Sequence, residues 1–90
     1  MKVLQSGRFS RKIKKLNKHE KAALDKAVRE IINDPTIGQA KKGDLLGVRV
    51  YKYKYSTNLL LLAYRYEGLQ NELTLLAHGG HENFYRDLKQ

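Results

Sequence analysis

The last ten residues of the chain combine side chains that can move protons and bind phosphate. His81 and Tyr85 are four residues apart, a spacing that places both on one face of a helical turn. Imidazole transfers protons near neutral pH, and a phenol hydrogen-bonds phosphate or stacks on a base. We therefore predict a reactive pair here. The alternative is an ordinary terminal turn, in which Phe84 and Leu88 pack inward and the other two side chains are solvated.

Cations that could stabilise the charge of a phosphate lie in two predicted strands. Residues 48–55 alternate at a period of two and are rich in β-branched and aromatic side chains, and residues 59–66 are almost all apolar. Successive side chains of a strand point to opposite faces, so either the row of Arg49 with the alternating tyrosines or the pair Lys52 and Lys54 faces a given side. The candidate cations are Arg49, Lys52, Lys54 and Arg65.

The remaining histidines and the missing cysteines limit other chemistry. His78 ends a predicted strand beside Gly79 and Gly80 and is a candidate to join the site, whereas His19 opens a predicted helix and is expected to be solvated. Without Cys, a His-x₃-His pair or an acidic cluster, the sequence predicts no metal site. The two glycines lack the companion residues of a phosphate-binding loop, so no cofactor is expected.

Positive charge is concentrated at the start of the chain. The formal net charge is +9, and residues 1–30 carry ten basic and three acidic side chains. Such a field attracts polyanions, whereas the alternative is a solvated basic face that only aids solubility. The candidate RNA-binding residues are Lys12, Lys14, Lys15 and Lys18.

Apolar spacing predicts two helices before the strands. Phe9, Ile13 and Leu16 recur at helical intervals and predict a short helix from Ser10 to about Leu16. A second helix follows an N-cap at Asn17, with Glu20 as capping-box partner, and ends at the sequence Asn33-Asp34-Pro35.

The remaining segments complete the predicted order. Residues 2–6 are a possible edge strand, residues 36–44 a polar loop, and residues 72–78 a last strand broken by the glycine pair. The order β-α-α-β-β-β predicts an α+β fold in which an N-terminal strand and a helical hairpin pack on one face of an antiparallel meander, followed by a C-terminal helical turn. The other sheet face is expected to stay partly open.

Residues 1–90 are predicted to be one domain. With no long apolar run and no Cys, the chain is expected in the cytoplasm, away from the membrane.

Over essentially its whole length the chain resembles toxins of the RelE/ParE superfamily, from bacterial type II toxin–antitoxin systems. The resemblance rests on this small basic element order, on residues 43–52 entering the meander, on residues 59–66, and on the terminal segment from Gly80 to Tyr85. A His followed four residues later by an aromatic residue is similar to the YafQ-like branch, and a Tyr near the C-terminus to RelE-like members.

The resemblance implies one of two activities. RelE- and YafQ-like toxins cut messenger RNA on the ribosome, whereas ParE-like toxins inhibit DNA gyrase, and in both cases a cognate antitoxin masks the toxin. The C-terminal pair favours the ribonuclease, with His81 as acid or base. The sequence departs from the RelE pattern at residues 59–62, where leucines stand in place of an arginine, and from the YafQ pattern in its fewer histidines. Gyrase inhibition is therefore the alternative, followed by a non-catalytic nucleic-acid-binding domain.

Overall fold

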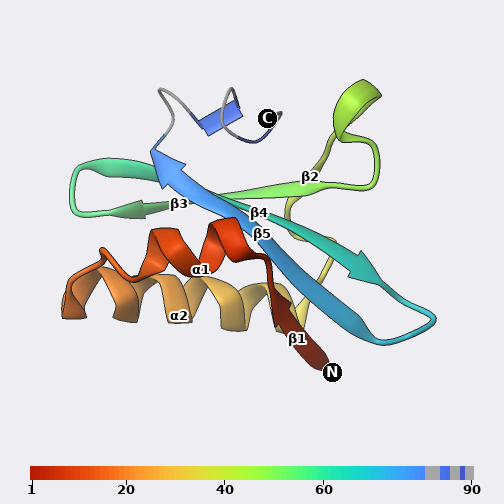
Figure 1. Cartoon of the computed structure of the whole chain (residues 1–90), viewed down its shortest axis with the longest axis horizontal. Helices are drawn as coiled ribbons and strands as arrows, with labels where there is room; N and C mark the ends of the chain where they lie inside the picture. Colours follow the sequence, from red (N-terminus) through yellow and green to blue (C-terminus); the bar gives the residue numbers. More distant parts are fainter. Residues whose placement is uncertain (81–83, 86–87, 89–90) are drawn as a thin grey trace.

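Two helices cover one side of a five-stranded sheet (Figure 1). The structure is a computed structural model that describes residues 1–80, 84–85 and 88. The helices are α1 (Gly7–Ile13) and α2 (Lys18–Asn33), and the 3-10 turn is η1 (Gly43–Leu45). The strands are β1 (Lys2–Gln5), β2 (Gln39–Ala40), β3 (Arg49–Tyr55), β4 (Asn58–Glu67) and β5 (Glu72–Gly80). This arrangement confirms the predicted α+β architecture.

The sheet has the strand order β1-β5-β4-β3-β2. β3, β4 and β5 form the predicted antiparallel meander, and β1 pairs in parallel with the first half of β5, from Glu72 to Leu75. β2 pairs only with Val50 and Arg49 at the start of β3. The prediction of a polar loop over residues 36–44 missed β2, because two of its residues add to the sheet by pairing with β3, a contact that local composition does not indicate.

Capping residues set where the helices begin. α2 starts as predicted: the Asn17 Oδ1 accepts from the Glu20 N–H at 2.8 Å, and the Glu20 carboxylate accepts from the Asn17 N–H at 2.9 Å. α1 starts earlier than the predicted Ser10, because the Ser6 hydroxyl accepts from the Phe9 N–H at 3.1 Å and caps the helix there. α1 also ends earlier, at Ile13. Neither helix in the described part of the chain is long and apolar enough to cross a bilayer.

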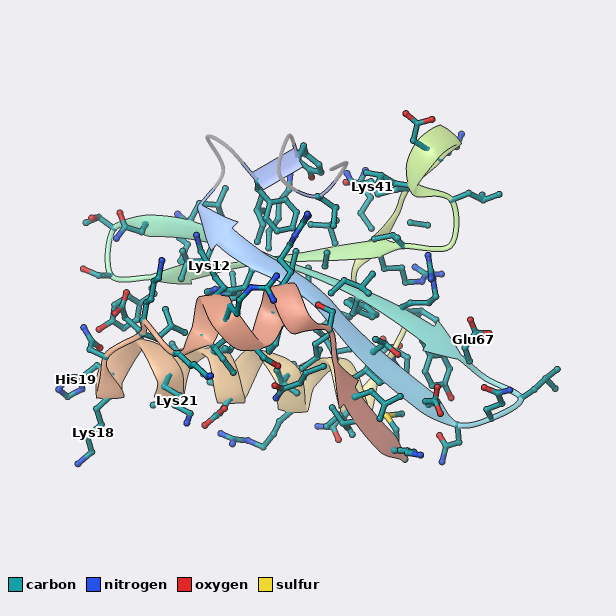
Figure 2. The ribbon with its side chains drawn as sticks, in the orientation of Figure 1. Lys12, Lys18, His19, Lys21, Lys41 and Glu67 are labelled. Atoms are coloured by element: carbon teal, nitrogen blue, oxygen red, sulfur yellow. The ribbon has the colours of Figure 1, made fainter. Side chains whose placement is uncertain are left out.

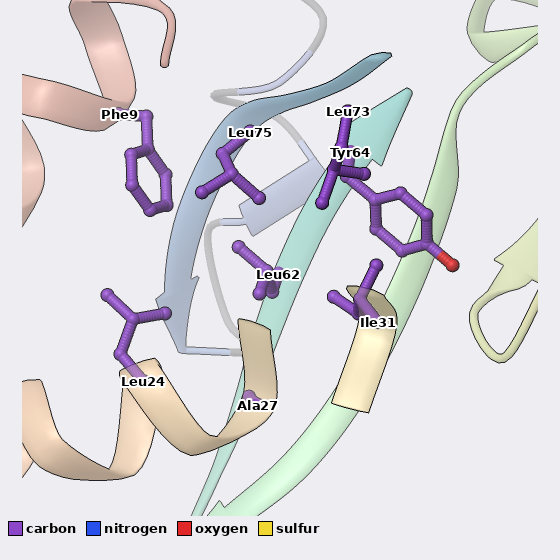
Figure 3. Close-up of a cluster of buried hydrophobic side chains, with 8 residues drawn as sticks. All are labelled: Phe9, Leu24, Ala27, Ile31, Leu62, Tyr64, Leu73 and Leu75. Atoms are coloured by element: carbon purple, nitrogen blue, oxygen red, sulfur yellow. The ribbon is translucent and has the colours of Figure 1, made fainter. Parts of the chain in front are cut away.

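The main core lies between the helices and the sheet (Figure 3). Its buried members come from both helices, β4 and β5: Phe9, Leu24, Ala27, Ile31, Leu62, Tyr64, Leu73 and Leu75. Each helix presents an apolar stripe to the sheet, as the 3.6-residue period requires. Tyr51 and Tyr53 of β3 pack against this core. We call this side of the sheet the helix face.

A smaller core covers part of the opposite side, which we call the second face. Its buried members are Val48, Val50, Leu61, Ala63, Ala77 and Phe84. Phe84, Tyr85 and Leu88 are helical, and Figure 1 shows the segment that contains them on the side of the sheet away from α1 and α2. The predicted C-terminal helical residues thus close one part of the second face. Val50 belongs to this core, so by alternation Lys52 and Lys54 also lie on the second face.

β5 continues through the glycine pair, contrary to the predicted break. Gly79 pairs with Leu61 and Gly80 with Leu60, so the ladder with β4 decides where the strand ends. An irregularity interrupts this ladder: Tyr64 pairs with Leu75 and Ala63 with Ala77, which leaves Leu76 as an extra residue in β5. Such a β-bulge changes which face the following side chains occupy.

Candidate nucleic-acid interface

A cationic cavity of about 760 Å³ lies between α1 and the end of β5. Its lining residues are Arg8, Arg11, Lys12, Lys14, Lys15, Ala77, His78, Gly79, Gly80 and Phe84. Five of these side chains are basic, and none of the lining residues that the structure describes is acidic. The cavity therefore concentrates much of the positive charge of the N-terminal segment at one place.

α1 positions these cations because one of its sides is anchored to the sheet. Phe9 is buried in the main core, and the Ser6 hydroxyl that caps the helix also donates to the Leu76 carbonyl at 2.8 Å. The Ser6 N–H donates to the Leu75 carbonyl at 2.9 Å. These contacts fix the beginning of α1 against β5, so the basic side of the helix lies beside the last residues of that strand.

Three of the four predicted RNA-binding lysines gather here. Lys12, Lys14 and Lys15 line the cavity, and a methyl group at Gly79 would lie 3.8 Å from the Lys12 Cε. Lys18 does not line it, since it begins α2. Figure 2 shows Lys18 and His19 at the exposed end of that helix, apart from Lys12.

His78 enters the cavity wall from β5 and is almost fully buried, with 7% of its surface exposed. It pairs with Leu62, whose side chain is in the main core, so the imidazole lies on the helix face. There its Nε2 is 2.6 Å from the Tyr53 hydroxyl, and the two rings stack with centroids 5.9 Å apart. The Nδ1 is buried and has no hydrogen-bond partner among the described residues.

The surroundings keep both groups neutral. Burial lowers the pKa of His78 to about 4; the Lys12 charge acts in the same direction, and Glu20 opposes it. Burial also raises the pKa of the Tyr53 phenol, with a smaller contribution from Glu20. A neutral phenol that donates to Nε2 leaves the imidazole proton on Nδ1, and we assign this tautomer.

Lys52 and Lys54 are exposed on β3, away from this cavity. A smaller hollow of about 310 Å³ lies between α2 and the part of β3 beyond its pairing with β2, which forms the edge of the sheet. Lys52 and Lys54 border it at this edge, together with Tyr51, Glu30 and neighbouring residues. The Tyr51 hydroxyl donates a hydrogen bond to the Glu30 carboxylate. That bond, together with burial, raises the pKa of Tyr51 to about 12.

The two candidate arginines do not lie beside these lysines. Arg49 donates to the Gly38 carbonyl at 2.8 Å and to the Thr36 carbonyl at 3.3 Å, and so ties the loop after α2 to the sheet. Arg65 is exposed and pairs with Thr74 near one end of β4, whereas Lys54 pairs with Leu59 near the other end. Those positions of β4 are six residue steps apart along the strand, roughly 20 Å.

Of the two C-terminal candidates, Tyr85 and His81, only Tyr85 is among the described residues. Tyr85 is half-buried against the second core, stacks edge-on against Phe84 with centroids 5.3 Å apart, and has the Lys41 ammonium 4.9 Å from its ring centroid. His81, the proposed acid or base, lies outside the described residues. Tyr85 is thus on the same sheet face as Lys52 and Lys54.

Arg8 and Arg11 line the cavity but were not among the predicted RNA-binding residues. Arg8, Arg11, Lys12 and Lys15 recur at intervals of three, one and three residues, the spacing of one helix face, and this pattern was a usable signal. Nothing in the sequence indicated the contact between Tyr53 and His78. Over the described ranges, no group of three or more His, Cys, Asp or Glu side chains is arranged to hold a metal ion.

The sequence matches one protein family over nearly its whole length. Residues 3–89 match the family described as ParE-like toxin of type II bacterial toxin–antitoxin system. No curated protein matches the chain by sequence.

Solved structures share the fold. The Escherichia coli RelBE toxin–antitoxin complex contains a chain that superposes with a TM-score of 0.71 at 20% identity, over 90% of this chain and 96% of that one. The RelBE2 toxin–antitoxin complex of Mycobacterium tuberculosis gives 0.67 at 17% identity, over 89% and 96% of the two chains. A YoeB/ParE toxin from Agrobacterium tumefaciens gives 0.69 at 16% identity, over 90% and 99%.

The family match covers residues 3–89. The fold of two helices on a mixed five-stranded sheet, which the solved toxin structures share, is consistent with that match. The chain belongs to the ParE-like toxin family of type II bacterial toxin–antitoxin systems.

Proposed function

We propose that this toxin cleaves messenger RNA on the ribosome, without a metal ion, and so stops translation. The observation that supports this most directly is the common location of Lys52, Lys54 and Tyr85 on the second face of the sheet. β5 leads from its last residue, Gly80, directly into the sequence that contains His81. Two ammonium groups, a phenol and an imidazole are sufficient for the reaction.

The proposed reaction is an attack by the 2′-hydroxyl of the RNA on the neighbouring phosphate. A base removes the 2′-hydroxyl proton, the 2′ oxygen bonds to phosphorus, and the bond from phosphorus to the 5′ oxygen breaks. The 5′ oxygen takes up a proton, which leaves a 2′,3′-cyclic phosphate and a 5′-hydroxyl. His81 carries the acid–base role, Lys52 and Lys54 stabilise the phosphate charge, and Tyr85 contacts the phosphate or a base. Arg49 and Arg65 have no part in this proposal, because of where they lie.

The positive charge of the N-terminal segment favours two kinds of partner, RNA and an acidic antitoxin. Lys12, Lys14, Lys15 and Lys18 attract ribosomal and messenger RNA in the cytoplasm. The complexes named for E. coli and M. tuberculosis each pair a toxin with an antitoxin. We therefore expect a cognate antitoxin, with an acidic segment that folds on this toxin and masks it.

Gyrase inhibition is the second candidate, and one observation favours it. The part of the second face beneath Phe84 is apolar, with Val50, Leu61 and Ala63 where a charged reaction centre would need polar groups. A binding toxin would need the positive surface but no acid–base residues.

A purified-toxin experiment separates the two candidates. Messenger RNA cleavage is mapped in a cell-free translation reaction, beside a DNA gyrase supercoiling assay. His81→Gln removes proton transfer and should lower cleavage by about 10²–10⁴-fold. Lys52→Ala with Lys54→Ala should also lower it. The control Lys21→Ala with Arg29→Ala removes the same charge from exposed positions on α2 and should retain cleavage.

The two assays give opposite patterns for the two functions. Cleavage that depends on His81, with supercoiling unaffected, supports the ribonuclease. Inhibited supercoiling with intact messenger RNA, unchanged by His81→Gln, overturns it in favour of gyrase. Co-expression with the product of the neighbouring small open reading frame should restore growth, and toxicity that persists would contradict the antitoxin proposal.

A further inference from the structure

We propose that the cavity between α1 and the end of β5 is a binding site for a nucleoside phosphate, distinct from the sheet face that carries Lys52 and Lys54. This proposal rests on the proposed function, because RNA would be the source of the nucleotide. It adds a second place on the toxin where RNA is held. Three features of the cavity support this: its charge, its apolar wall and one buried nitrogen atom.

The charge of the cavity suits a phosphate. Arg8, Arg11 and Lys12 line it from α1, and Lys14 and Lys15 line it from the turn that follows this helix. Arginine binds phosphate through two parallel hydrogen bonds, and lysine adds a mobile point charge. A solvated basic face alone would spread these groups over a convex surface. Here they border a hollow of about 760 Å³, within the range of small-molecule sites.

The opposite wall suits a nucleobase. Phe84 and Ala77 border the cavity with the small part of their surface that the second core leaves exposed and make this wall apolar, and a nucleobase packs against apolar and aromatic groups with little dependence on sequence. Gly79 and Gly80 carry no side chain, so the backbone of β5 is accessible at this wall. β1 ends opposite Leu75, and along residues 77–80 no further strand among the described residues pairs with that edge. Its backbone groups are therefore available to the edge of a base.

His78 supplies a hydrogen bond that has no partner within the described chain. Its side chain is more than nine-tenths buried, it lines the cavity, and its Nδ1 is unsatisfied. Leaving a buried donor unpaired is unfavourable, so a ligand oxygen or ring nitrogen that accepts from Nδ1 removes that cost. The bond to Tyr53 holds the ring in this orientation.

These three features together favour a nucleotide over an acidic peptide. Carboxylates of a peptide would use the cations, but they would leave the phenyl wall and the buried nitrogen without a matched partner. A nucleoside phosphate uses all three at once. The same chemistry is offered by a free nucleotide and by one nucleotide of an RNA strand.

Equilibrium binding to the purified full-length toxin tests the site without requiring cleavage. Isothermal titration calorimetry measures the dissociation constants of GMP, AMP, CMP, UMP and inorganic phosphate. These are compared with the dissociation constant of a labelled five-nucleotide RNA, measured by fluorescence anisotropy. We expect at least one mononucleotide to bind more tightly than phosphate. Much tighter binding of the RNA identifies the strand as the source of the ligand, and comparable affinity identifies a free nucleotide.

Two matched pairs of variants locate the binding. Arg11→Ala with Lys12→Ala should weaken it at least tenfold, whereas Lys21→Ala with Arg29→Ala, an equal charge change outside the cavity, should weaken it by less than about threefold. His78→Leu and Tyr53→Phe both break the bond between those residues, but only the first removes Nδ1. His78→Leu should therefore cost about three- to tenfold more affinity than Tyr53→Phe.

Several outcomes would overturn the proposal. Equal losses in the two charge pairs would mean that only the overall field binds the ligand. Mononucleotides no tighter than phosphate would remove the base wall from the argument. A synthetic acidic peptide that binds here while nucleotides do not would assign the cavity to a protein partner. Circular dichroism checks that each variant is folded. Nucleotide binding by a toxin that leaves messenger RNA intact would keep this site and reject the ribonuclease.

Discussion

Replacing Tyr64 by Phe removes a single oxygen atom that connects the sheet to the loop after α2. Tyr64 has 0% of its surface exposed, and its hydroxyl donates to the Pro35 carbonyl at 2.7 Å. The same hydroxyl accepts from the Gly38 N–H at 2.9 Å in a buried hydrogen bond. Gly38 also accepts from Arg49, and its neighbour Gln39 begins β2. The hydroxyl thus holds the segment through which the chain enters the sheet edge.

The cost of Tyr64→Phe follows from these two bonds. Each hydrogen bond contributes about 0.5–1.5 kcal/mol net, and a buried N–H left unpaired costs about 1–3 kcal/mol. Since the Phe ring preserves packing, we expect the free energy of unfolding to fall by about 2–3 kcal/mol. For a domain of this size that corresponds to a decrease in Tm of roughly 10–20 °C.

Urea denaturation followed by circular dichroism measures this loss. Tyr66→Phe is the matched control, because the Tyr66 ring is only partly buried and its hydroxyl has no hydrogen bond to the part of the chain that the structure describes. The control should change stability by less than about 0.5 kcal/mol. A Tyr64→Phe variant as stable as the control would refute the reasoning, since the hydroxyl would then have no stabilising role.

Two further predictions concern stability. The pKa of His78 is lowered to about 4 in the folded chain, from 6.5, so the unfolded chain gains a proton first and the free energy of unfolding falls as pH decreases from about 6.5 to about 4. His78→Leu removes this contribution, and its urea midpoint should depend less on pH in that window; equal pH dependence would argue against it. Asn17→Ala breaks the capping box of α2 and should cost about 1 kcal/mol in the same denaturation experiment, whereas Asn17→Asp should retain most of the stability. An Asn17→Ala variant with an unchanged midpoint would mean that the cap contributes nothing.

Local patterns predicted the helices and strands whose signals are contained in a few neighbouring residues. The cap at Asn17 and the alternation in β3 are of this kind, because hydrogen bonds and side-chain direction there depend on positions one to four residues away. β2 could not be predicted in this way, since its two residues are extended only by pairing with β3. The same holds for Gly79 and Gly80, which stay in β5 because β4 lies opposite.

The residues of the candidate site also fall into two groups, those predicted from local sequence and those brought together only by contacts between distant parts of the chain. Four lysines between residues 12 and 18 were predicted from charge alone, and three of them, Lys12, Lys14 and Lys15, do line the cavity. The contact between His78 and Tyr53 joins residues 25 positions apart, and no periodic pattern encodes it. Alternation left two choices for β3, and only the packing of Val50 in the second core places Lys52 and Lys54 on that face. The roles of these residues in RNA cleavage stay predictions.

The extra residue at Leu76 determines the composition of the cavity. Before it, Leu75 faces the helices; with uninterrupted alternation Ala77 would face them too, and His78 would point to the other side. The bulge reverses this assignment, so Ala77 joins the second core and the imidazole meets Tyr53. Insertion or deletion of a single residue here would therefore exchange the two side chains without any substitution. When related toxins are aligned, equivalence along this strand is better judged by its partners in β4 than by residue count.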